Sequence, residues 1–454
     1  MKKLLLTGFA LVSMLTQAQS WVDQATKFPV NFGVDELDIV DANTVWTFAY
    51  DGSGGGTYPK IVSRTTNGGA TWTATNVTGP GSNALISDIS AVDANTAWIV
   101  TAGNGQAGTN PNRIWKTADG GTTWTQQTSV GYSSASFGNQ IYFWDANNGW
   151  TNGDPLGGFF EMYKTSNGGA TWTLVPGRPG QEGDFGYVGL KEVVGDNIWF
   201  GTDLGRILHS TDRGSTWTAS YSPVLDFGGV TTAGSSGSFA FKDGSNGLLI
   251  AVDGAGSPAT TTAGLYSSND AGATWDPVTP TGPWYFGDIT YVPGTANTYV
   301  STGINGGTTA NPKPEWLGSS YSTDGGLTWT AIDSGEQRGK VQFLNPTTGW
   351  AGQFSDGPAG TSGILKFVGD LALGVSDNAV KSGLQISPNP ASDVVTIKAK
   401  NEIQAVTVID LSGKRVKSFT DAKQVNVSSL AKGTYILQVF YVNGSVEQTK
   451  LMKK

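Results

Sequence analysis

The chain of 454 residues contains no cysteine, a single histidine and only 14% charged residues. The missing cysteines exclude a disulfide framework, a thiol nucleophile and any Cys-ligated zinc or iron–sulfur cluster. One histidine excludes a multi-histidine metal site, and a Ser-His-Asp hydrolase would have to use His209. We therefore expect neither a metal ion nor a cofactor, and these absences argue against most kinds of catalysis.

Long apolar runs are also scarce. The run from Leu4 to Leu15 follows two lysines and precedes small residues around Ala18, which is the order of a secretory signal peptide. No later segment approaches the roughly 20 apolar residues that span a bilayer. The sequence therefore predicts a signal peptide over residues 1–18 and an exported mature protein without a transmembrane segment.

The charges are unevenly distributed along the chain. Residues 19–378 contain 15 basic and 31 acidic side chains, whereas residues 379–454 contain 11 basic and 5 acidic ones. An acidic body repels phosphate backbones, so nucleic acid is not an expected partner of that part. We interpret the basic residues of the C-terminal part mainly as solubilising.

Glycine and tryptophan are abundant, with 64 and 16 residues, and many of them belong to an internal repeat. Its first copy, Thr65–Trp72, reads TTNGGATW. The pattern S/T-x-D/N-x-G-x-T-W returns at Thr117–Trp124, Thr165–Trp172, Ser210–Trp217, Ser268–Trp275 and Ser322–Trp329. Successive tryptophans are 45 to 58 residues apart, about the length of one four-stranded propeller blade.

Each copy predicts a tight hairpin turn. The Asn or Asp oxygen can accept hydrogen bonds from nearby backbone N–H groups, and the second glycine, Gly69 in the first copy, supplies a positive φ. The tryptophan opens the next strand and can wedge between adjacent sheets. We assign a structural role to these Asx and Trp residues: Asn67, Trp72, Asp119, Trp124, Asn167, Trp172, Asp212, Trp217, Asp270, Trp275, Asp324 and Trp329. The six copies closely resemble the Asp-box, or BNR, repeat.

A second half-repeat precedes each box and consists of an apolar strand, a turn of the D-A-N type and another strand, as in Leu37 to Trp46. Seven such hairpins against six boxes predict an all-β fold with a seven-bladed β-propeller over residues 19–368. The last blade lacks an outer strand. Because the segment Ser20 to Thr26 resembles the strands after the boxes, we expect it to complete that blade and close the ring.

The end of the chain differs in composition. Residues 369–383 are predicted to form a linker, and period-2 strands separated by Ser-Gly and Asn-Gly turns over residues 384–454 predict a small Ig-like antiparallel β-sandwich. This segment closely resembles the type A C-terminal sorting domain of the type IX secretion system of Bacteroidota. The resemblance rests on Pro388, Asn389, Pro390, Asp393, Asp410, Gly413, Gly433, Tyr435 and Lys450.

The resemblance to sorting domains implies a route and partners. The general export pathway would carry the chain across the inner membrane, and the type IX machinery would then translocate it across the outer membrane. In this family the sorting domain is usually removed, and the cargo is released or tethered to surface lipopolysaccharide. We therefore expect a protein that is secreted or attached to the outer cell surface.

Candidate binding residues lie in the connections opposite the boxes, because resembling propellers bind ligands on that face or at the channel mouth. In five blades a Phe-Gly pair precedes the innermost strand, and these rings could surround the channel mouth as an aromatic collar for a sugar or a peptide. The alternative is that each phenylalanine packs between blades. The candidate ligand-binding residues are Phe32, Phe137, Phe185, Phe227, Phe286, Trp284 and Trp316.

Two functions remain open at this point. Photosystem II assembly factors and sortilin-type ectodomains, which this propeller resembles, bind partners without catalysis, and this favours a non-catalytic module that binds a glycan or a protein. The alternative is a secreted glycoside hydrolase, xyloglucanase-like or sialidase-like, that uses the loop carboxylates Asp184 and Asp226. A sialidase needs three substrate-binding arginines and an early R-I/L-P motif, which is absent here. Xyloglucanases bind their glycan between two propellers, whereas this chain predicts one. The arginines that could form a sialidase triad are Arg113, Arg178, Arg206 and Arg338.

Overall fold

The chain divides into two compact units, Met1–Gly374 and Val375–Lys454. The computed structural model describes residues 19–454 except 104–110, 129, 182, 255–259, 304–306, 309–310, 358–359, 373–383, 400, 411–414, 421–422 and 443–445. The predicted signal peptide, most of the predicted linker and Gly413 therefore lie outside the described residues.

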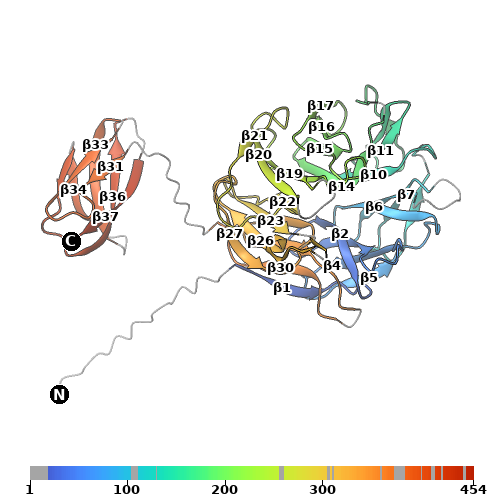
Figure 1. Cartoon of the computed structure of the whole chain (residues 1–454), viewed down its shortest axis with the longest axis horizontal. Coiled ribbons are helices and arrows are strands. Elements are labelled where there is room, and N and C mark those ends of the chain that lie inside the picture. Colours follow the sequence, from blue (N-terminus) through green and yellow to red (C-terminus); the bar gives the residue numbers. More distant parts are fainter. Residues whose placement is uncertain are drawn as a thin grey trace, which may run out of the picture. The chain divides into compact units, whose positions relative to one another are not determined.

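The N-terminal unit is a ring of four-stranded antiparallel sheets around a central channel (Figure 1). Between Ser20 and Val368 the described residues form seven such sheets, or blades, and the first six take their strands in chain order from the centre outward. Blades 1 to 3 consist of β2 (Phe32–Ile39), β3 (Val45–Asp51), β4 (Ile61–Thr65) and β5 (Thr73–Asn76); β6 (Ala84–Ala91), β7 (Ala97–Gly103), β8 (Arg113–Thr117) and β9 (Thr125–Gln127); and β10 (Gly138–Phe143), β11 (Gly149–Leu156), β12 (Phe159–Thr165) and β13 (Thr173–Leu174).

Blades 4 to 6 repeat the same order, and blade 6 carries an insertion in its middle connection. Blades 4 and 5 consist of β14 (Gly186–Val194), β15 (Asn197–Thr202), β16 (Arg206–Ser210) and β17 (Thr218–Tyr221), and of β18 (Ser236–Phe241), β19 (Gly247–Asp253), β20 (Thr262–Ser268) and β21 (Asp276–Val278). Blade 6 consists of β22 (Asp288–Tyr291), β23 (Tyr299–Gly303), β26 (Gly318–Ser322) and β27 (Thr330–Ser334), with the short pair β24 (Gly307–Thr308) and β25 (Asn311–Pro312) and the 3-10 turn η1 (Pro314–Trp316) inserted.

The seventh blade joins the two ends of the propeller. Its inner strands are β28 (Val341–Asn345), β29 (Thr348–Gly352) and β30 (Gly363–Val368), and its outer strand is the N-terminal β1 (Ser20–Ala25). β1 pairs antiparallel with β30 in a continuous register from Ser20 opposite Val368 to Ala25 opposite Gly363. The prediction that the N-terminal strand closes the ring is confirmed, because β1 supplies the outer strand of the last blade.

Tryptophans of the second strands fill the spaces between blades. Trp46, Trp98, Trp150, Trp199 and Trp350 are all fully buried, and each lies on the second strand of its blade. Trp98 of blade 2 stacks on Phe143 of blade 3 with 3.6 Å between ring centroids. Full burial of such a ring contributes about 2 to 3 kcal/mol, so these five side chains are a principal source of cohesion between blades.

The six boxes form turns with the same hydrogen bonds. In the first box, Thr71 N donates to Asn67 Oδ1 at 2.9 Å and Gly69 N donates to Thr65 Oγ1 at 2.9 Å. Gly69 has φ +85°, a conformation that favours glycine. The bond from the backbone N–H of the threonine before the box tryptophan recurs from Thr123 to Asp119, Thr171 to Asn167, Thr216 to Asp212, Thr274 to Asp270 and Thr328 to Asp324.

The box tryptophans are less uniformly placed than their turns. Trp72, Trp124, Trp172 and Trp329 are buried, whereas Trp217 and Trp275 are half-buried. Trp124 Nε1 and Trp329 Nε1 each donate to the carbonyl of the second box glycine, at 3.2 and 2.9 Å. The turn and the strand that follows it are thus tied together within each of these boxes.

The C-terminal unit is a sandwich of two antiparallel sheets, as the strand pattern predicts. One sheet has three strands in the order β31 (Gln385–Ser387), β32 (Val394–Lys398) and β35 (Gln424–Asn426). The other has four in the order β34 (Arg415–Thr420), β33 (Ile403–Asp410), β36 (Gly433–Tyr441) and β37 (Val446–Lys453). Fully buried valines and leucines from both sheets form one apolar core, which includes Val395, Val406, Val408, Leu437 and Val439.

The Pro-Asn-Pro segment holds the last strand of this sandwich. Asn389 Nδ2 donates to Lys450 O at 2.8 Å, and Met452 N donates to Asn389 Oδ1 at 2.8 Å, so the side-chain amide pairs like a strand residue. Next to it, Ala391 N donates to Met452 O at 2.8 Å and Lys454 N donates to Ala391 O at 2.9 Å. Residues far apart in the sorting motif therefore form one hydrogen-bonded edge.

Candidate functional site

The propeller has two faces of different construction. We call the face with the six boxes the box face, and the opposite face, which carries the connections between second and third strands and between successive blades, the loop face. The innermost strands run from the loop face toward the box face and line the channel. A ligand could reach the loop face, the box face or the channel between them.

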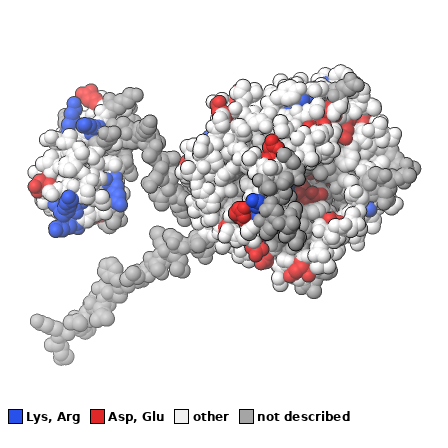
Figure 2. All heavy atoms as spheres, viewed as in Figure 1, with Lys and Arg blue, Asp and Glu red and all other residues white. Residues whose placement is uncertain are grey.

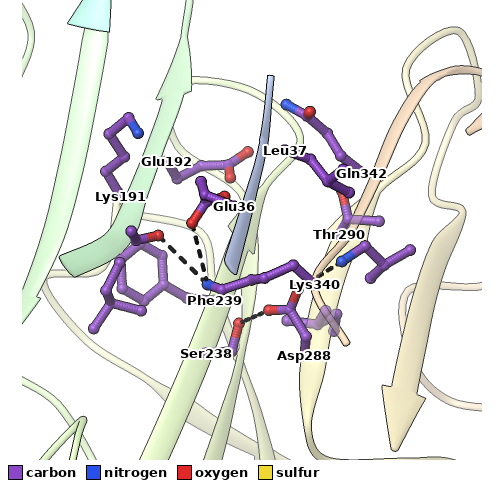
Figure 3. Close-up of a pocket in the computed structure, with 14 residues that line it drawn as sticks. Glu36, Leu37, Lys191, Glu192, Ser238, Phe239, Asp288, Thr290, Lys340 and Gln342 are labelled. Atoms are coloured by element: carbon purple, nitrogen blue, oxygen red, sulfur yellow. Dashed lines mark hydrogen bonds and ion pairs between the residues drawn. The ribbon is translucent and has the colours of Figure 1, made fainter. Parts of the chain in front are cut away.

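Two lysines on different blades extend across the channel. Lys191 of β14 reaches from blade 4 to blade 2, where its Nζ lies 2.6 Å from Asp88 Oδ2. Lys340, just before β28, reaches from blade 7 toward blade 4 and donates to Gly189 O at 3.4 Å (Figure 3). Its Nζ also lies 3.8 Å from Glu36 Oε2. A pocket of about 70 Å³ lies at this level, and residues of blades 1, 4, 5, 6 and 7, both lysines among them, line it.

Half-buried carboxyl groups surround the two lysines. Burial raises the pKa of Asp35 to about 6, of Glu36 and Asp38 to about 7, and of Glu192 to about 8. Burial alone would lower the pKa of Lys191, but the attraction of Asp88 and Glu36 outweighs it and the pKa is raised. The lysines therefore stay charged near neutral pH, while several of the acids around them retain protons.

Several channel side chains also fasten neighbouring blades to one another. Asp88 Oδ2 accepts from Ile141 N at 2.8 Å, and Asp288 Oδ2 accepts from Val341 N at 2.9 Å. Asp288 of blade 6 also contacts the preceding blade, because its Oδ1 accepts from Ser238 Oγ of blade 5 at 2.6 Å (Figure 3). These bonds link innermost strands about fifty residues apart, which gives the carboxylates a role in holding the ring.

A larger cavity of about 400 Å³ lies beside these two lysines, toward the box face. It is lined by residues near the ends of the innermost strands, among them Asp38, Tyr142, Glu192, Tyr291 and Gln342. None of these channel residues was among the candidates predicted from the sequence. The sequence does contain a signal for them, because charged residues interrupt the innermost strands in the segments VDELD, LISDIS and LKEVV. Apolar and polar residues normally alternate more regularly in an antiparallel strand.

The two predicted catalytic carboxylates are both buried and engaged. Asp226 accepts hydrogen bonds from Tyr187 Oη at 2.5 Å, from Gly228 N, Gly229 N and Thr232 N, and from both the N–H and the hydroxyl of Thr231. Burial would raise the pKa of Asp226, but these bonds outweigh it and lower the pKa to about 2. Such a carboxylate is a fixed acceptor that organises the connection around it.

Asp184 is paired with a cation. Its Oδ2 lies 2.7 Å from Arg206 Nη1, and the two side chains are 0% and 8% exposed. Burial raises the pKa of Asp184 and of the neighbouring Asp203, and the two carboxyl groups interact. Asp184 Oδ1 is buried without a hydrogen-bond partner, so Asp184 and Asp226 are both inaccessible to a substrate on the loop face, although only Asp226 has both oxygens engaged.

The predicted aromatic collar is split into separate groups. Phe227 is 4% exposed and packs against Phe239, which is the inter-blade packing considered as the alternative. Phe185 is half-buried and lies edge-on to Tyr187 at 5.5 Å. Phe32 packs against the core between blades 7 and 1, and Phe137 is half-buried at the start of blade 3.

Blade 6 brings the remaining three candidates together. The ring of Phe286 lies 6.0 Å from Trp284 and 5.4 Å from Trp316, edge-on in both cases. All three are half-buried, and Lys313 Nζ lies over Trp316 at 5.6 Å while also 3.6 Å from the exposed Glu315. We call Trp284, Phe286 and Trp316 the aromatic trio. The aromatic trio brings together the connection between blades 5 and 6, which carries Trp284 and Phe286, and the inserted turn η1, which carries Trp316.

Blades 3 to 5 expose apolar side chains on the same face. The connection between β11 and β12 is a tight hairpin with Gly157 and Gly158 at its tip. Tyr221 Oη donates to Gln181 Oε1 at 3.2 Å, and a Cβ on Gly180 would meet Gly158 O, so the connections of these blades touch. We call the exposed set the apolar rim: Leu156, Phe159, Val188, Tyr221, Leu225 and Val230, which are 37% to 68% exposed.

Other candidate chemistry is accounted for by local contacts. The four arginines weighed as a sialidase triad are engaged separately, with Arg206 on Asp184 and Arg338 on Asp333 at 2.7 Å. His209 stacks on Trp199 at 4.5 Å, and burial lowers its pKa to about 4, so the imidazole is neutral. Within the described part of the chain, no cluster of three or more His, Asp or Glu has a metal-binding arrangement, and no helix could cross a membrane.

Comparison with protein families identifies both units. Residues 385–454 match the secretion system C-terminal sorting domain, and residues 320–331, the sixth box, match the BNR/Asp-box repeat. The N-terminal unit is thus a BNR-type β-propeller. The whole chain is a BNR-type propeller with a type IX sorting domain, which directs its export to the cell surface or beyond.

Known proteins with similar sequences or folds are distant. A xyloglucanase of Hypocrea jecorina (strain QM6a) is 25% identical over 281 residues, which are 54% of this chain and 31% of that enzyme, so the chain spans about a third of its length. A structure of YCF48 bound to D1 peptide has a TM-score of 0.52 at 16% identity and covers 78% of this chain and 98% of its own. An ancestral GH74 enzyme has a TM-score of 0.48 at 11% identity, over 95% of this chain and 63% of its own.

Proposed function

We propose that the exported propeller is a non-catalytic binding module that holds a glycan or a protein ligand on its loop face. The observation that carries the proposal is the state of the two candidate carboxylates. Asp226 is saturated with hydrogen-bond donors, and Asp184 is buried in a pair with Arg206. Glycoside hydrolysis needs one carboxyl group as acid and another as nucleophile or base, both reaching the scissile bond.

The loop face supplies surface for binding instead. Exposed apolar groups at the apolar rim are the kind of surface that proteins use for association. The aromatic trio, with Lys313 and Glu315 beside it, combines flat apolar surface with charged hydrogen-bonding groups, as sugar and peptide sites do. The structural likeness to YCF48 bound to D1 peptide, at 16% identity, supports the fold alone.

A binding assay with matched variants tests this proposal. The purified full chain is screened against polysaccharides and against surface proteins of the producing bacterium, with Trp316→Ala, Phe159→Ser and Leu327→Ser as variants. Leu327 is 55% exposed but lies in a box, on the opposite face, and serves as the control. We expect at least a tenfold loss of affinity for one loop-face variant and none for Leu327→Ser. Equal binding by all three variants would overturn the placement of the site.

A glycoside hydrolase is the second candidate, favoured by the 25% identity to a xyloglucanase. Incubating the full chain with xyloglucan and with sialylated glycans, and measuring released reducing ends or sialic acid, tests this alternative directly. We expect no turnover. Release of product that is lost in Asp184→Ala or Asp226→Ala, with the fold intact, would replace the binding proposal by the catalytic one.

A further inference from the structure

The cavity beside the two lysines continues into a second cavity toward the box face. The second cavity also measures about 400 Å³, and it shares Asp38, Ile39 and Tyr142 with the first. Its other lining residues include Asp93 and Asp145, on the turns that follow the innermost strands of blades 2 and 3. Each volume lies within the range of roughly 300 to 1,000 Å³ that is usual for small-molecule sites in proteins. We call the two adjoining cavities the box-face groove.

Aromatic side chains line both parts of the box-face groove. Tyr142, which belongs to both cavities, lies edge-on to Trp144 of the second cavity with 5.1 Å between ring centroids. Tyr291, at the end of β22 in blade 6, lines the first cavity. All three rings are half-buried, so part of each ring is exposed. Such rings offer flat apolar surface and attract cations to their faces.

Two half-buried carboxyl groups, those of Asp38 and Glu192, belong to the lining of the first cavity. In the described part of the chain neither of them forms an ion pair. The lysines of the same lining have other partners, because Lys191 Nζ contacts Asp88 and Lys242 Nζ donates to a side-chain amide of blade 6 at 2.7 Å. Acidic side chains are visible at the centre of the ring in Figure 2. The groove therefore combines aromatic surface with an excess of negative charge.

The raised pKa values in the groove agree with this excess of negative charge. Burial raises the pKa of Asp38 to about 7 and, together with the nearby Asp288, that of Glu192 to about 8. Burial and the same two carboxyl groups also raise the pKa of Tyr142 to about 12. Ionisation of these carboxyl groups therefore costs free energy, which a bound cation would offset. Groups with such shifts inside a cavity are frequent at functional sites.

We infer that the box-face groove binds a linear oligosaccharide whose residues carry free amino groups, with its end in the first cavity. Asp38 and Glu192 bind the ammonium groups, and Tyr142 and Tyr291 contact the sugar rings. A lysine-rich peptide fits less well, because its apolar side-chain stems would meet polar groups of several blades, among them Gln342 of blade 7. The groove opens toward the box face, so the inference is independent of any ligand on the loop face.

Three trisaccharides with one backbone test the chemistry of the ligand. The β-1,4-linked trimers of glucosamine, N-acetylglucosamine and glucose differ only in the group at C2, and isothermal titration calorimetry of the full chain gives their Kd values. We expect the glucosamine trimer to bind at least about tenfold more tightly than either of the others, because only this trimer carries ammonium groups. Equal affinities for the glucosamine and glucose trimers, no binding of the glucosamine trimer, or tighter binding of trilysine than of the glucosamine trimer would each overturn the inference.

Variants of the full chain test the location of the site. Glu192→Gln and Asp38→Asn keep the size of the side chain and remove its charge, and Glu336→Gln, at an exposed position between blades 6 and 7, is the matched control. We expect each of the first two to weaken binding of the glucosamine trimer at least about tenfold without changing that of the glucose trimer, and the control to change neither.

Tyr142→Leu probes the aromatic surface separately from the charge. It removes the flat ring but keeps an apolar side chain, and it should weaken binding of all three trimers about threefold. Thermal unfolding of each variant checks that the propeller is folded. Unchanged binding of the glucosamine trimer by Glu192→Gln and Asp38→Asn, or an equal loss in Glu336→Gln, would place the ligand elsewhere and contradict the inference.

Discussion

The box face and the channel of the propeller are held together in opposite ways. Each box is fastened by bonds between residues two to four positions apart, such as Thr71 N to Asn67 Oδ1, and the same bonds return in every copy. In the channel, Lys191 reaches Asp88, 103 residues away, and Lys340 reaches Gly189, 151 residues away. Blades 2 and 6 each contribute one aspartate there, Asp88 and Asp288, whereas blade 4 contributes Lys191 and Glu192 and blade 7 contributes Lys340.

This difference between the box face and the channel shows in which part of the propeller the blades are interchangeable. A turn that satisfies itself locally can be repeated without reference to its neighbours, so the box is a structural element in all six positions. A charge that is buried must find a partner across the ring, since an unpaired buried charge costs several kcal/mol. The channel therefore depends on every blade at once, and mutations there should have larger effects than mutations in a box.

The largest effect is expected for Asp88→Ala. The substitution removes the partner of Lys191 and the acceptor for Ile141 N, so a buried ammonium is left without its carboxylate. Breaking a buried pair in this way costs roughly 3 to 5 kcal/mol. Equilibrium urea unfolding of the full chain, followed by tryptophan fluorescence, measures the change.

Two controls sharpen that measurement. Asp196→Ala breaks the exposed pair with Arg213, whose side chains are 59% and 42% exposed, and should cost less than about 1 kcal/mol. The double variant Asp88→Leu with Lys191→Met removes both charges and should be more stable than Asp88→Ala. A cost for Asp88→Ala no greater than for Asp196→Ala would show that the channel charges do not hold the ring.

The next effect concerns pH. Burial raises the pKa of Glu192 to about 8 from the ordinary 4.5, so the folded protein binds a proton that the unfolded chain has released. This contribution to stability is complete below about pH 4.5 and is lost as the pH rises through about 8. Glu192→Gln should remove a fall in stability on the order of 2 kcal/mol between pH 5 and pH 8.5.

Thermal unfolding across that pH range measures the fall, and Glu315→Gln is the matched control because the Glu315 side chain is 61% exposed. The wild-type protein and Glu315→Gln should lose stability in parallel as the pH rises. An unchanged slope in Glu192→Gln would mean that the proton is held elsewhere in the channel.

A smaller effect is expected in the boxes. Asn67→Ala removes the acceptor for Thr71 N and the donor to Thr71 Oγ1. Each such hydrogen bond contributes about 0.5 to 1.5 kcal/mol, so the variant should lose roughly 1 to 2 kcal/mol in urea unfolding. The exposed neighbour Thr66→Ala is the control. A loss as large as that of Asp88→Ala would remove the contrast between box and channel.

The smallest effect on stability is expected on the loop face. Phe159 is 53% exposed at the tip of its hairpin, and surface substitutions of this kind change stability by less than about 0.5 kcal/mol. Phe159→Ser should therefore unfold at the wild-type urea concentration while its ligand affinity falls. A stability loss above 1 kcal/mol would show that the apolar rim is part of the fold and not a free surface.

Much of the fold could be predicted from the sequence because the relevant signals are local and repeated. The six boxes, the seven hairpins and the resemblance of Ser20–Thr26 to an outer strand together predict seven blades and the closure that β1 and β30 make. The alternation of the last seventy residues predicts the sandwich in the same way. Box turns need no knowledge of the rest of the chain.

The candidate site could be predicted only in outline. The Phe-Gly pairs occupy equivalent positions in the sequence, so the sequence could not show which rings are buried between blades. Phe227 packs against Phe239, whereas Phe286 contacts Trp284 and Trp316, and the lengths of the neighbouring connections make this difference. Asp226 looked like a free loop acid, since its donors come from a turn that only the folded chain forms.

The sequence by itself thus determined the repeat, the number of blades, the closing strand and the export domain, all of which depend on short-range patterns. The tertiary structure alone decided which carboxylates are engaged, which aromatic rings are exposed, and that two lysines extend across the channel to other blades. Those properties arise between side chains of different blades, up to 151 residues apart, where partner and burial are fixed only once the ring is closed.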